Sequence, residues 1–193
     1  MSQLIYSVIA SLDGYIADED GSFDWAVPGE EVLDHITGQL RAVSTYLYGR
    51  RMYELMTVWE TDPAAAAQSP GSADFARVWQ RARKVVFSTT LAAASTSNTT
   101  LERAFDPERV ARIKTESEGD LTIDGPTIAA HAFRAGLVDV VDVVVVPVMI
   151  GGGTSIWPDG VRLELRLLEE RRFSGGKVAL RYAVIAAGGS SSP

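Results

Sequence analysis

Three short segments of the sequence place glycine beside polar or basic residues where an apolar run ends and the chain turns. They are Ala10-Ser-Leu-Asp-Gly-Tyr-Ile-Ala17, Tyr48-Gly-Arg-Arg-Met-Tyr-Glu54 and Ile123-Asp-Gly-Pro-Thr-Ile128. The second and third turn into predicted helices, whose unpaired N-terminal amides attract anions. Two such helix starts side by side predict a binding site for a pyrophosphate.

A fourth polar segment, Val86-Phe-Ser-Thr-Thr90, ends another predicted strand with three hydroxyls. Together with Arg50 or Arg51 these hydroxyls could hold one further phosphate, which would indicate NADPH rather than NADH. Two plainer explanations stay open, because hydroxyls also cap chain ends and Gly-Arg-Arg is also typical of a solvated basic turn. No Gly-x-Gly-x-x-Gly follows the first predicted strand, so the ordinary dinucleotide fingerprint is absent.

The segment from Gly136 to Thr154 joins a largely apolar strand to three consecutive glycines, Gly151, Gly152 and Gly153. Glycine permits positive φ and lets backbone amides approach a ligand closely. A tight turn and a ligand-binding loop are both compatible with this pattern.

Apolar runs alternate with amphipathic stretches along the chain, which predicts an α/β fold whose largely parallel sheet is closed by an antiparallel C-terminal pair. Predicted strands cover residues 4–10, 43–48, 84–88, 120–124, 139–148, 161–172 and 177–186. Predicted helices cover residues 29–41, 50–57, 73–83, 107–117 and 126–136. We expect residues 1–187 to form a single domain, with a flexible surface loop over 61–72 and a disordered tail over 188–193.

The composition restricts the possible partners. A length of 193 residues with 46% hydrophobic content suits one domain, and a net charge of -7 argues against a nucleic-acid or anionic-membrane partner. The absence of cysteine excludes disulfides and thiolate catalysis and fits a cytoplasmic protein. His35 and His131 lack a partner at metal-ligand spacing, so no metal is expected.

Taken in order, these motifs resemble the dihydrofolate-reductase-like superfamily, and within it the reductase domain of bifunctional riboflavin-biosynthesis enzymes and its stand-alone bacterial relatives. The resemblance rests on Ser11-Leu-Asp-Gly-Tyr-Ile-Ala17, Gly49-Arg-Arg, Val85-Val-Phe-Ser-Thr-Thr90, Asp124-Gly125, and Gly136-Leu-Val-Asp139 through Pro147-Val-Met-Ile-Gly-Gly-Gly153. It implies a three-layer α/β/α fold with a mixed, mostly parallel sheet, an NADPH cofactor and a homodimer. The chain starts on the first predicted strand and lacks cysteine, so we expect no preceding zinc deaminase domain.

The resemblance also implies roles for individual residues. The loop beside the nicotinamide would contain Ser11, Leu12, Gly14 and Ile16, and the turn facing it would contain Gly151 and Gly152, with Thr154 flanking the active site. The cofactor phosphates would be bound by Gly49, Arg50 and Arg51, the adenosine 2′-phosphate by Ser88, Thr89 and Thr90, and the pyrophosphate by Gly125, Pro126, Thr127 and Ile128.

The reaction implied is hydride transfer, which needs the two carbons held about 3 to 3.5 Å apart with bulk water excluded. Protonation of the acceptor needs an acid or an ordered water, and we take Asp34 and Asp13 as the candidate catalytic residues. Dipole complementarity at a helix start and an Asp-Gly turn are the plainer explanations of these two carboxylates. Tyr15, Phe23 and Trp25 could form a stacking wall for a planar substrate, although filling of the core explains Phe23 and Trp25 equally well.

Two departures from the riboflavin-pathway pattern concern the substrate. Val140 and Val146 replace residues that are commonly polar in the family, and no basic residues for a substrate ribose phosphate can be identified. The sequence therefore predicts an NADPH-dependent oxidoreductase, acting on CH–OH or CH–NH groups of a pyrimidine- or pteridine-type small heterocycle. Dihydrofolate reductase and a non-catalytic NADPH-binding protein are the alternatives.

Overall fold

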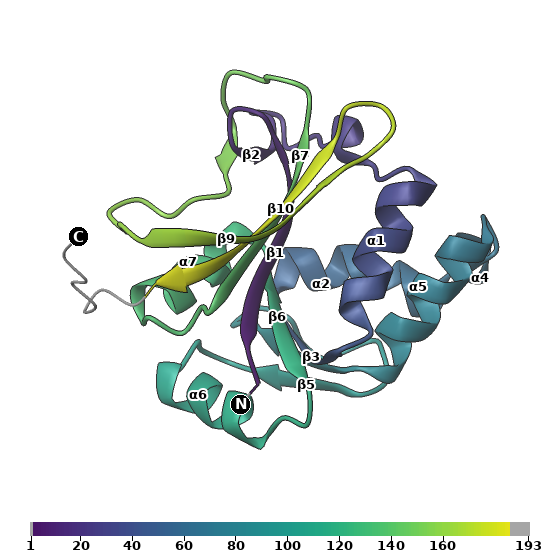
Figure 1. Cartoon of the computed structure of the whole chain (residues 1–193). Helices are drawn as coiled ribbons and strands as arrows, with labels where there is room; N and C mark the ends of the chain where they lie inside the picture. The colour runs from purple at the N-terminus through teal and green to yellow at the C-terminus, as the bar shows by residue number, and fades with distance from the viewer. Residues whose placement is uncertain (1, 186–193) are drawn as a thin grey trace.

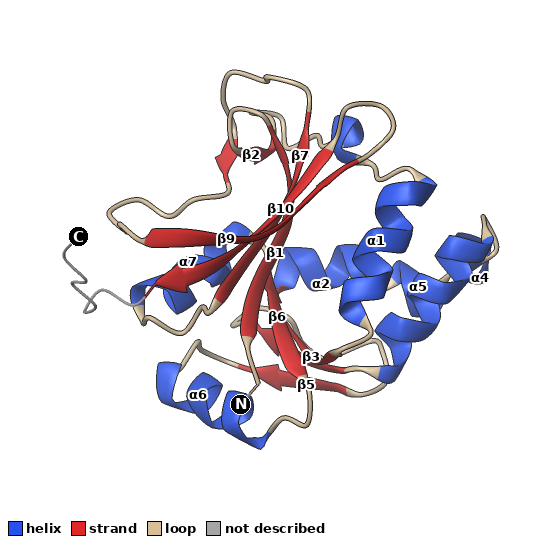
Figure 2. Cartoon of the chain, in the orientation of Figure 1, coloured by secondary structure: helices blue, strands red, loops and turns tan. Residues whose placement is uncertain are grey.

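The structure, a computed structural model, describes residues 2–185 and consists of two sheets and the helices around them (Figures 1 and 2). The strands of the main sheet are β1 Leu4–Ser11, β3 Val43–Gly49, β4 Arg83–Phe87, β5 Thr99–Glu102, β6 Asp120–Asp124, β7 Val140–Val146, β9 Glu164–Arg172 and β10 Val178–Ile185. A small second sheet pairs β2 Tyr15–Ala17 with β8 Thr154–Ser155. The helices are α1 Glu30–Leu40, α2 Arg50–Met56, α3 Val58–Thr61, α4 Pro63–Ala66, α5 Pro70–Arg81, α6 Pro107–Glu116 and α7 Pro126–Arg134, with a 3-10 turn η1 at Asp24–Ala26.

The main sheet is mixed but mostly parallel, with the strand order β5-β4-β3-β6-β1-β7-β10-β9. Every pair from β5 to β7 is parallel, whereas β10 runs antiparallel to both β7 and β9. Strands in the middle of such a sheet are covered on both faces, which explains why β7 reads as a nearly continuous valine run. The predicted fold class and the antiparallel C-terminal hairpin are confirmed.

Helices cover both faces of the sheet, and a hydrophobic core lies beneath them on each face. On one face, α6 and α7 bury Val110, Ile113 and Phe133 against β1 and β6. On the other face, Leu33 of α1 and Trp79 of α5 lie in the core over β3 and β4. The chain therefore forms the three layers that the resemblance implied, and Figure 2 shows the helices on either side of the strands.

The prediction of a flexible loop over residues 61–72 is wrong. This segment contains α4 and the first turn of α5, which begins at Pro70 rather than at residue 73. The Asp62 carboxylate accepts the amide proton of Ala64 at 2.9 Å, and the Ser69 hydroxyl accepts that of Ser72 at 3.1 Å. Both helices thus start with a capping side chain followed by proline, a signal that the abundance of alanine, proline and glycine concealed.

The helix α3 and the turn η1 were not predicted either, and the other main differences concern strands. β2, β5 and β8 were not predicted, because β2 and β8 have only three and two residues and β5 is mostly polar. The strand predicted over residues 161–172 begins three residues before β9, which starts at Glu164. The predicted tail over 188–193 lies outside the described residues. Within residues 2–185 no helix is long and apolar enough to cross a membrane.

Candidate functional site

The glycine turns after β3 and β6 lie against each other at one edge of the sheet. A methyl group at Gly49 would lie 3.8 Å from Cβ of Ile128, and one at Gly125 would lie 3.7 Å from Cβ of Met52. Gly125 has φ +99°, a conformation that other residues rarely adopt. The starts of α2 and α7 are therefore neighbours, as the predicted pyrophosphate site requires. Exposed Thr127 and half-buried Pro126 belong to the same turn.

The hydroxyl turn after β4 is joined to this pair of turns by an arginine. Nη1 of Arg50, the first residue of α2, donates a hydrogen bond to Oγ1 of Thr90 at 2.8 Å. The Ser88 hydroxyl is buried and accepts the amide protons of Thr90 and Leu91 at 3.2 and 2.9 Å. Thr89 is exposed, as is Arg51 on α2. The structure thus brings the predicted basic and hydroxyl residues to one place.

Arg103 also reaches this turn and was not identified from the sequence. Its Nη1 donates to the carbonyl oxygens of Leu91 at 2.7 Å and Ser88 at 3.3 Å. Arg103 directly follows β5, a short strand with the polar sequence Thr-Thr-Leu-Glu. Without a hydrophobic alternation to reveal that strand, nothing placed Arg103 beside β4.

The loops after β1 and β7 are held together by Asp13. Its carboxylate oxygens accept the amide protons of Gly151 at 2.8 Å and Ile150 at 3.2 Å. The Ser11 hydroxyl, followed by these amide bonds, keeps the pKa of Asp13 below its ordinary value, so the side chain is ionised at neutral pH. An ionised carboxylate occupied by amides cannot act as the proton donor, and the structure instead gives Asp13 the task of joining the two loops.

The three consecutive glycines serve mainly the contact between these loops. Gly153 has φ +120°, and a methyl group there would lie 2.1 Å from the carbonyl oxygen of Ala17. At Gly152 a methyl group would lie 3.1 Å from the Glu19 carboxylate. The amide of Gly151 is already bonded to Asp13. The close approach that the glycines allow is therefore between two parts of this chain, whereas contact with a cofactor stays a prediction.

The predicted substrate-binding residues lie on these loops. Tyr15 in β2 and Thr154 in β8 belong to the small sheet, in which Thr154 pairs with Ala17. Half-buried Tyr15 donates its amide proton to the Ser11 hydroxyl at 2.9 Å. Trp25 lies in η1, and its indole nitrogen is buried without a hydrogen-bond partner among the described residues. Ile16 is half-buried and packs against the core, and Leu12 is 64% exposed.

Asp124, directly before Gly125, carries a buried carboxyl group. It accepts a hydrogen bond from the Thr122 hydroxyl at 3.0 Å, and burial raises its pKa to about 7. Burial, and to a smaller extent the charge of Asp124, raises the pKa of the nearby Tyr6 and Tyr46 hydroxyls. Below this pH the group is neutral and places no negative charge behind the turn that is predicted to bind a pyrophosphate.

Asp34, the other predicted catalytic residue, is exposed on α1 and lies beside the first turn of α5. A methyl group at Gly71 would be 2.9 Å from its Oδ1. Asp34 also lines a shallow hollow of about 320 Å³ together with His35, Gln39, Glu169 and Arg171. The hollow lies between α1 and the C-terminal hairpin rather than at the strand ends, so it is distinct from the phosphate turns. This geometry does not test the predicted catalytic role of Asp34, which stays a prediction.

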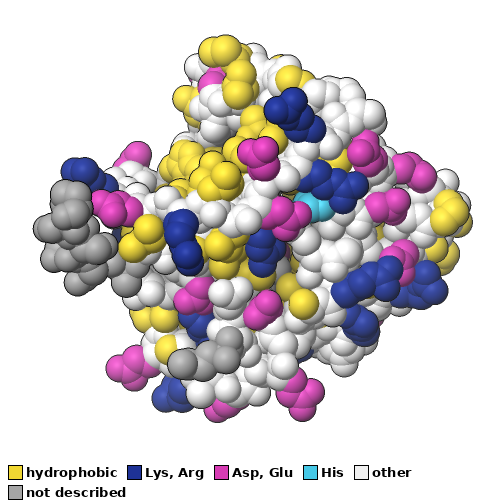
Figure 3. Space-filling model, viewed as in Figure 1, with side chains coloured by type: hydrophobic (Ala, Val, Ile, Leu, Met, Phe, Trp, Pro, Cys, Tyr) yellow, Lys and Arg dark blue, Asp and Glu magenta, His cyan; other side chains and the backbone are white. Residues whose placement is uncertain are grey.

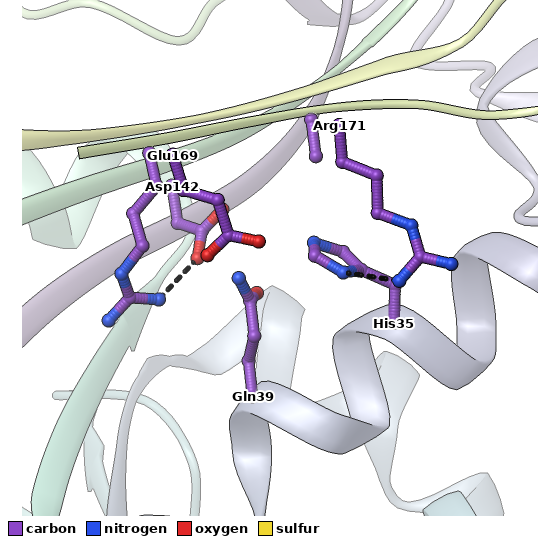
Figure 4. Close-up of a pocket in the computed structure, with 7 residues that line it drawn as sticks. His35, Gln39, Asp142, Glu169 and Arg171 are labelled. Carbon is purple, nitrogen blue, oxygen red and sulfur yellow. Dashed lines mark hydrogen bonds and ion pairs between the residues drawn. The ribbon is translucent and has the colours of Figure 1, made fainter. Parts of the chain in front are cut away.

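The inner part of this hollow is a junction of charges rather than an open site (Figure 4). Arg181 bonds the buried Asp142 carboxylate at 2.7 Å, and Arg171 lies 3.4 Å from Nδ1 of His35. Burial lowers the pKa of His35 and raises that of Asp142. Nε2 of His35 is buried here without a hydrogen-bond partner among the described residues. The strand ends are the better candidate for ligand binding, because the glycine, basic and hydroxyl turns gather there. The described residues contain no metal-binding cluster of His, Cys, Asp and Glu.

A family profile for the RibD C-terminal domain matches residues 2–179. The chain belongs to this family. The family includes reductases of riboflavin biosynthesis, which makes the chain reductase-like and agrees with the resemblance found in the sequence. No curated protein matched the chain in the sequence comparison.

Solved structures share the fold of this RibD C-terminal domain. A protein of Shewanella sp. PV-4, provisionally assigned to riboflavin biosynthesis, has a TM-score of 0.73 at 20% identity, over 96% of this chain and 99% of its own. A pyrimidine reductase-like protein of Corynebacterium diphtheriae has a TM-score of 0.64 at 14% identity, over 95% and 92%. The bifunctional deaminase/reductase of Thermotoga maritima has a TM-score of 0.63 at 14% identity, and the match spans 95% of this chain but 57% of that protein.

Replacing Gly153 by alanine should separate the two loops. Its methyl group cannot occupy a position 2.1 Å from the Ala17 carbonyl oxygen, so the loops must move apart in addition to the cost of a positive φ. We expect loss of amide hydrogen-exchange protection in residues 11–17 and 150–157. Gly160→Ala is the matched control, because Gly160 has φ +73° and nothing within 4 Å of the added methyl group. Equal effects of the two substitutions would contradict the close-contact explanation.

Replacing Asp124 by asparagine should change how stability depends on pH. The folded protein holds a proton on Asp124 up to about pH 7, whereas the unfolded chain loses it near the ordinary pKa of 3.8. The free energy of unfolding therefore falls as pH rises from about 4 to about 7, by about 4 kcal/mol at most from this group. Urea unfolding at pH 5 and pH 8 should show a smaller fall for Asp124→Asn than for the wild type, and an identical fall would refute the assignment.

Proposed function

We propose that this protein is an NADPH-dependent reductase of a pyrimidine- or pteridine-type small heterocycle. The main support is the meeting of the Gly49 and Gly125 turns with the Ser88–Thr90 turn at one edge of the sheet, joined by the bond from Arg50 to Thr90. Membership of the RibD C-terminal domain family supports the reductase class. The activity is similar to that named for the Thermotoga maritima protein, which is a 5-amino-6-(5-phosphoribosylamino)uracil reductase as well as a deaminase.

The residues at the strand ends fit a dinucleotide with an additional phosphate. The Gly49 and Gly125 turns would receive the pyrophosphate, because helix-start amides and a backbone without side chains allow close approach. Arg50, Ser88, Thr89 and Thr90 would bind the 2′-phosphate. Arg50 is also 3.1 Å from the Glu54 carboxylate, with which a phosphate would compete. When bound, NADPH supplies the hydride.

The loops after β1 and β7 would cover the reacting end of the cofactor. Their bonds through Asp13 and the Gly153–Ala17 contact hold them together, which helps to exclude water from a hydride transfer. Because Asp13 is ionised, the proton must come from elsewhere, and Asp34 or an ordered water stays the proposed source. The reaction would act on a CH–OH or CH–NH group.

The distribution of charge supports a substrate other than the phosphorylated riboflavin intermediate. Neither residues 1–40 nor residues 135–161 contain lysine or arginine, and these segments form the loops over the proposed substrate site. Lys177 reaches them from the hairpin, but its ammonium group bonds the carbonyl oxygen of Val27 at 2.9 Å. A substrate phosphate would therefore meet mainly carboxylates here, which favours a small heterocycle without phosphate.

Arg50→Ala should weaken binding of NADPH far more than binding of NADH. The lost guanidinium would contribute charge-assisted bonds worth roughly 1.5–3 kcal/mol to a group that NADH lacks. Titration of the purified protein with both cofactors, followed by nicotinamide fluorescence at fixed salt, measures the two dissociation constants. Equal losses would defeat the 2′-phosphate assignment, and a wild type that binds neither cofactor would defeat the proposed function.

We also propose that the protein works in the cytoplasm as a homodimer. The edge strand β9 exposes Leu165, Leu167 and Leu168 by 39%, 48% and 48%, and Figure 3 shows hydrophobic side chains among charges on the face that carries the hairpin. Pairing with a second copy would cover such an edge. Sedimentation equilibrium should give twice the mass of the chain, whereas a monomer at micromolar concentration would contradict the dimer.

A further inference from the structure

Arg103 is positioned at the hydroxyl turn by the pairing of β5 with β4. The two strands are parallel, with Phe87 opposite Glu102, and the amide of Ser88 donates to the carbonyl oxygen of Glu102 at 2.9 Å. The two strands therefore end at the same level, and Ser88, which follows β4, lies beside Arg103, which follows β5. From this position the exposed Arg103 side chain bonds the carbonyl oxygens of Ser88 and Leu91.

The turn has few other donors to offer an anion. The amides of Thr90 and Leu91 are bonded to the Ser88 hydroxyl at 3.2 and 2.9 Å, so they point into the turn rather than out of it. The donors that these described bonds leave at the turn are the amide of Thr89, the two threonine hydroxyls and the guanidinium groups. An anion at this turn must therefore be bound chiefly by side chains.

The two arginines at the turn differ in how far they are neutralised. Arg50 lies 3.1 Å from the Glu54 carboxylate, which offsets its charge. The bonds that the structure describes for Arg103 go to uncharged carbonyl oxygens, and none of the ion pairs within residues 2–185 involves it. Because a guanidinium is always protonated, Arg103 supplies a full positive charge to the turn.

The chain just beyond the turn is fixed as well. The Tyr53 hydroxyl accepts the amide protons of Ser95 at 2.8 Å and Thr96 at 3.1 Å, and the Glu60 carboxylate accepts that of Ser97 at 2.7 Å. Three successive amides are thus tied to α2 and α3. The segment leading from the turn to β5 is held before any ligand arrives, which lowers the entropy cost of binding.

We propose that Arg103 is a specificity-determining residue that selects NADPH over NADH, by pairing with the adenosine 2′-phosphate at the Ser88–Leu91 turn. The inference rests on the proposed function and adds to it a residue that follows β5. Its fork of donors can keep one bond to the turn while another turns to the phosphate. Arg50 and Arg103 then approach the same phosphate from α2 and from β5.

The test compares Arg103→Gln with Arg109→Gln. Glutamine keeps an amide that can bond the Leu91 carbonyl oxygen but removes the charge. Arg109, which lies 3.5 Å from the Glu102 carboxylate, is a nearby arginine away from the turn, so its substitution removes the same net charge. Dissociation constants are measured for NADPH and NADH, and for the fragments 2′,5′-ADP and 5′-AMP, at two salt concentrations. Thermal unfolding confirms that each variant is folded.

For Arg103→Gln we expect NADPH and 2′,5′-ADP to bind about tenfold to hundredfold more weakly, with NADH and 5′-AMP changed less than about twofold. Arg103→Lys should recover part of the loss, and Arg109→Gln should change none of the four constants by more than about twofold. Equal losses for both cofactors would mean that Arg103 only supports the turn. A wild type that prefers NADPH, with the preference unchanged in Arg103→Gln, would overturn this inference alone. A wild type that binds neither cofactor would overturn the proposed function as well.

Discussion

The arrangement of the candidate site depends on the parallel pairing of β3, β6, β1 and β7. In a parallel sheet all strands end at the same edge, so the turns after Gly49, Asp124, Ser11 and Val146 meet although they are far apart in sequence. The register is held from both faces, because the strands are buried beneath helices and a shift by one residue would turn the core side chains outward. The hydrophobic cores therefore fix the distances between the proposed phosphate turns without contributing a polar atom to them.

Glycine has different tasks at the two halves of this edge. At Gly125 the positive φ and the contact with Met52 bring a helix start against its neighbour, leaving backbone amides at the surface. At Gly153 the missing side chain allows two loops of the same chain to touch, and the amide of Gly151 is used on Asp13. The first arrangement suits the proposed pyrophosphate site, whereas the second would build the proposed cover over the cofactor. A run of glycines alone does not reveal which of these applies, because both need positive φ.

The parts of the fold that follow from the sequence are those with a strong apolar pattern. The buried strands β1, β3, β4, β6 and β7, the helices α1, α6 and α7 and the C-terminal hairpin were predicted close to their observed bounds. The short polar strand β5 was missed, and with it Arg103, since its place depends on a pairing with β4 that no local pattern encodes. Asp13 was selected from the sequence, but its hydrogen bonds to Ile150 and Gly151 were not predicted, since these partners are more than a hundred residues away. The order of the turn motifs along the sequence indicates which residues gather at this edge of the sheet. It does not indicate which of their polar atoms are already hydrogen-bonded within the protein.

The pairing of polar atoms separates the edge into two chemically different regions. Around the Ser88–Leu91 turn the amides of Thr90 and Leu91 are bonded within the turn while Arg50 and Arg103 supply positive charge, so this region suits an anion. Around the loops after β1 and β7 there is no arginine or lysine in the surrounding segments, Asp13 is occupied, and Leu12 and Met149 are 64% and 72% exposed. Moving apolar surface out of water favours the bound state of a planar heterocycle, whereas a phosphate would gain nothing there. A dinucleotide would suit both regions if its charged end lay over β4 and its nicotinamide lay over β1. In this orientation the apolar region beside the nicotinamide would remain available for the second reactant.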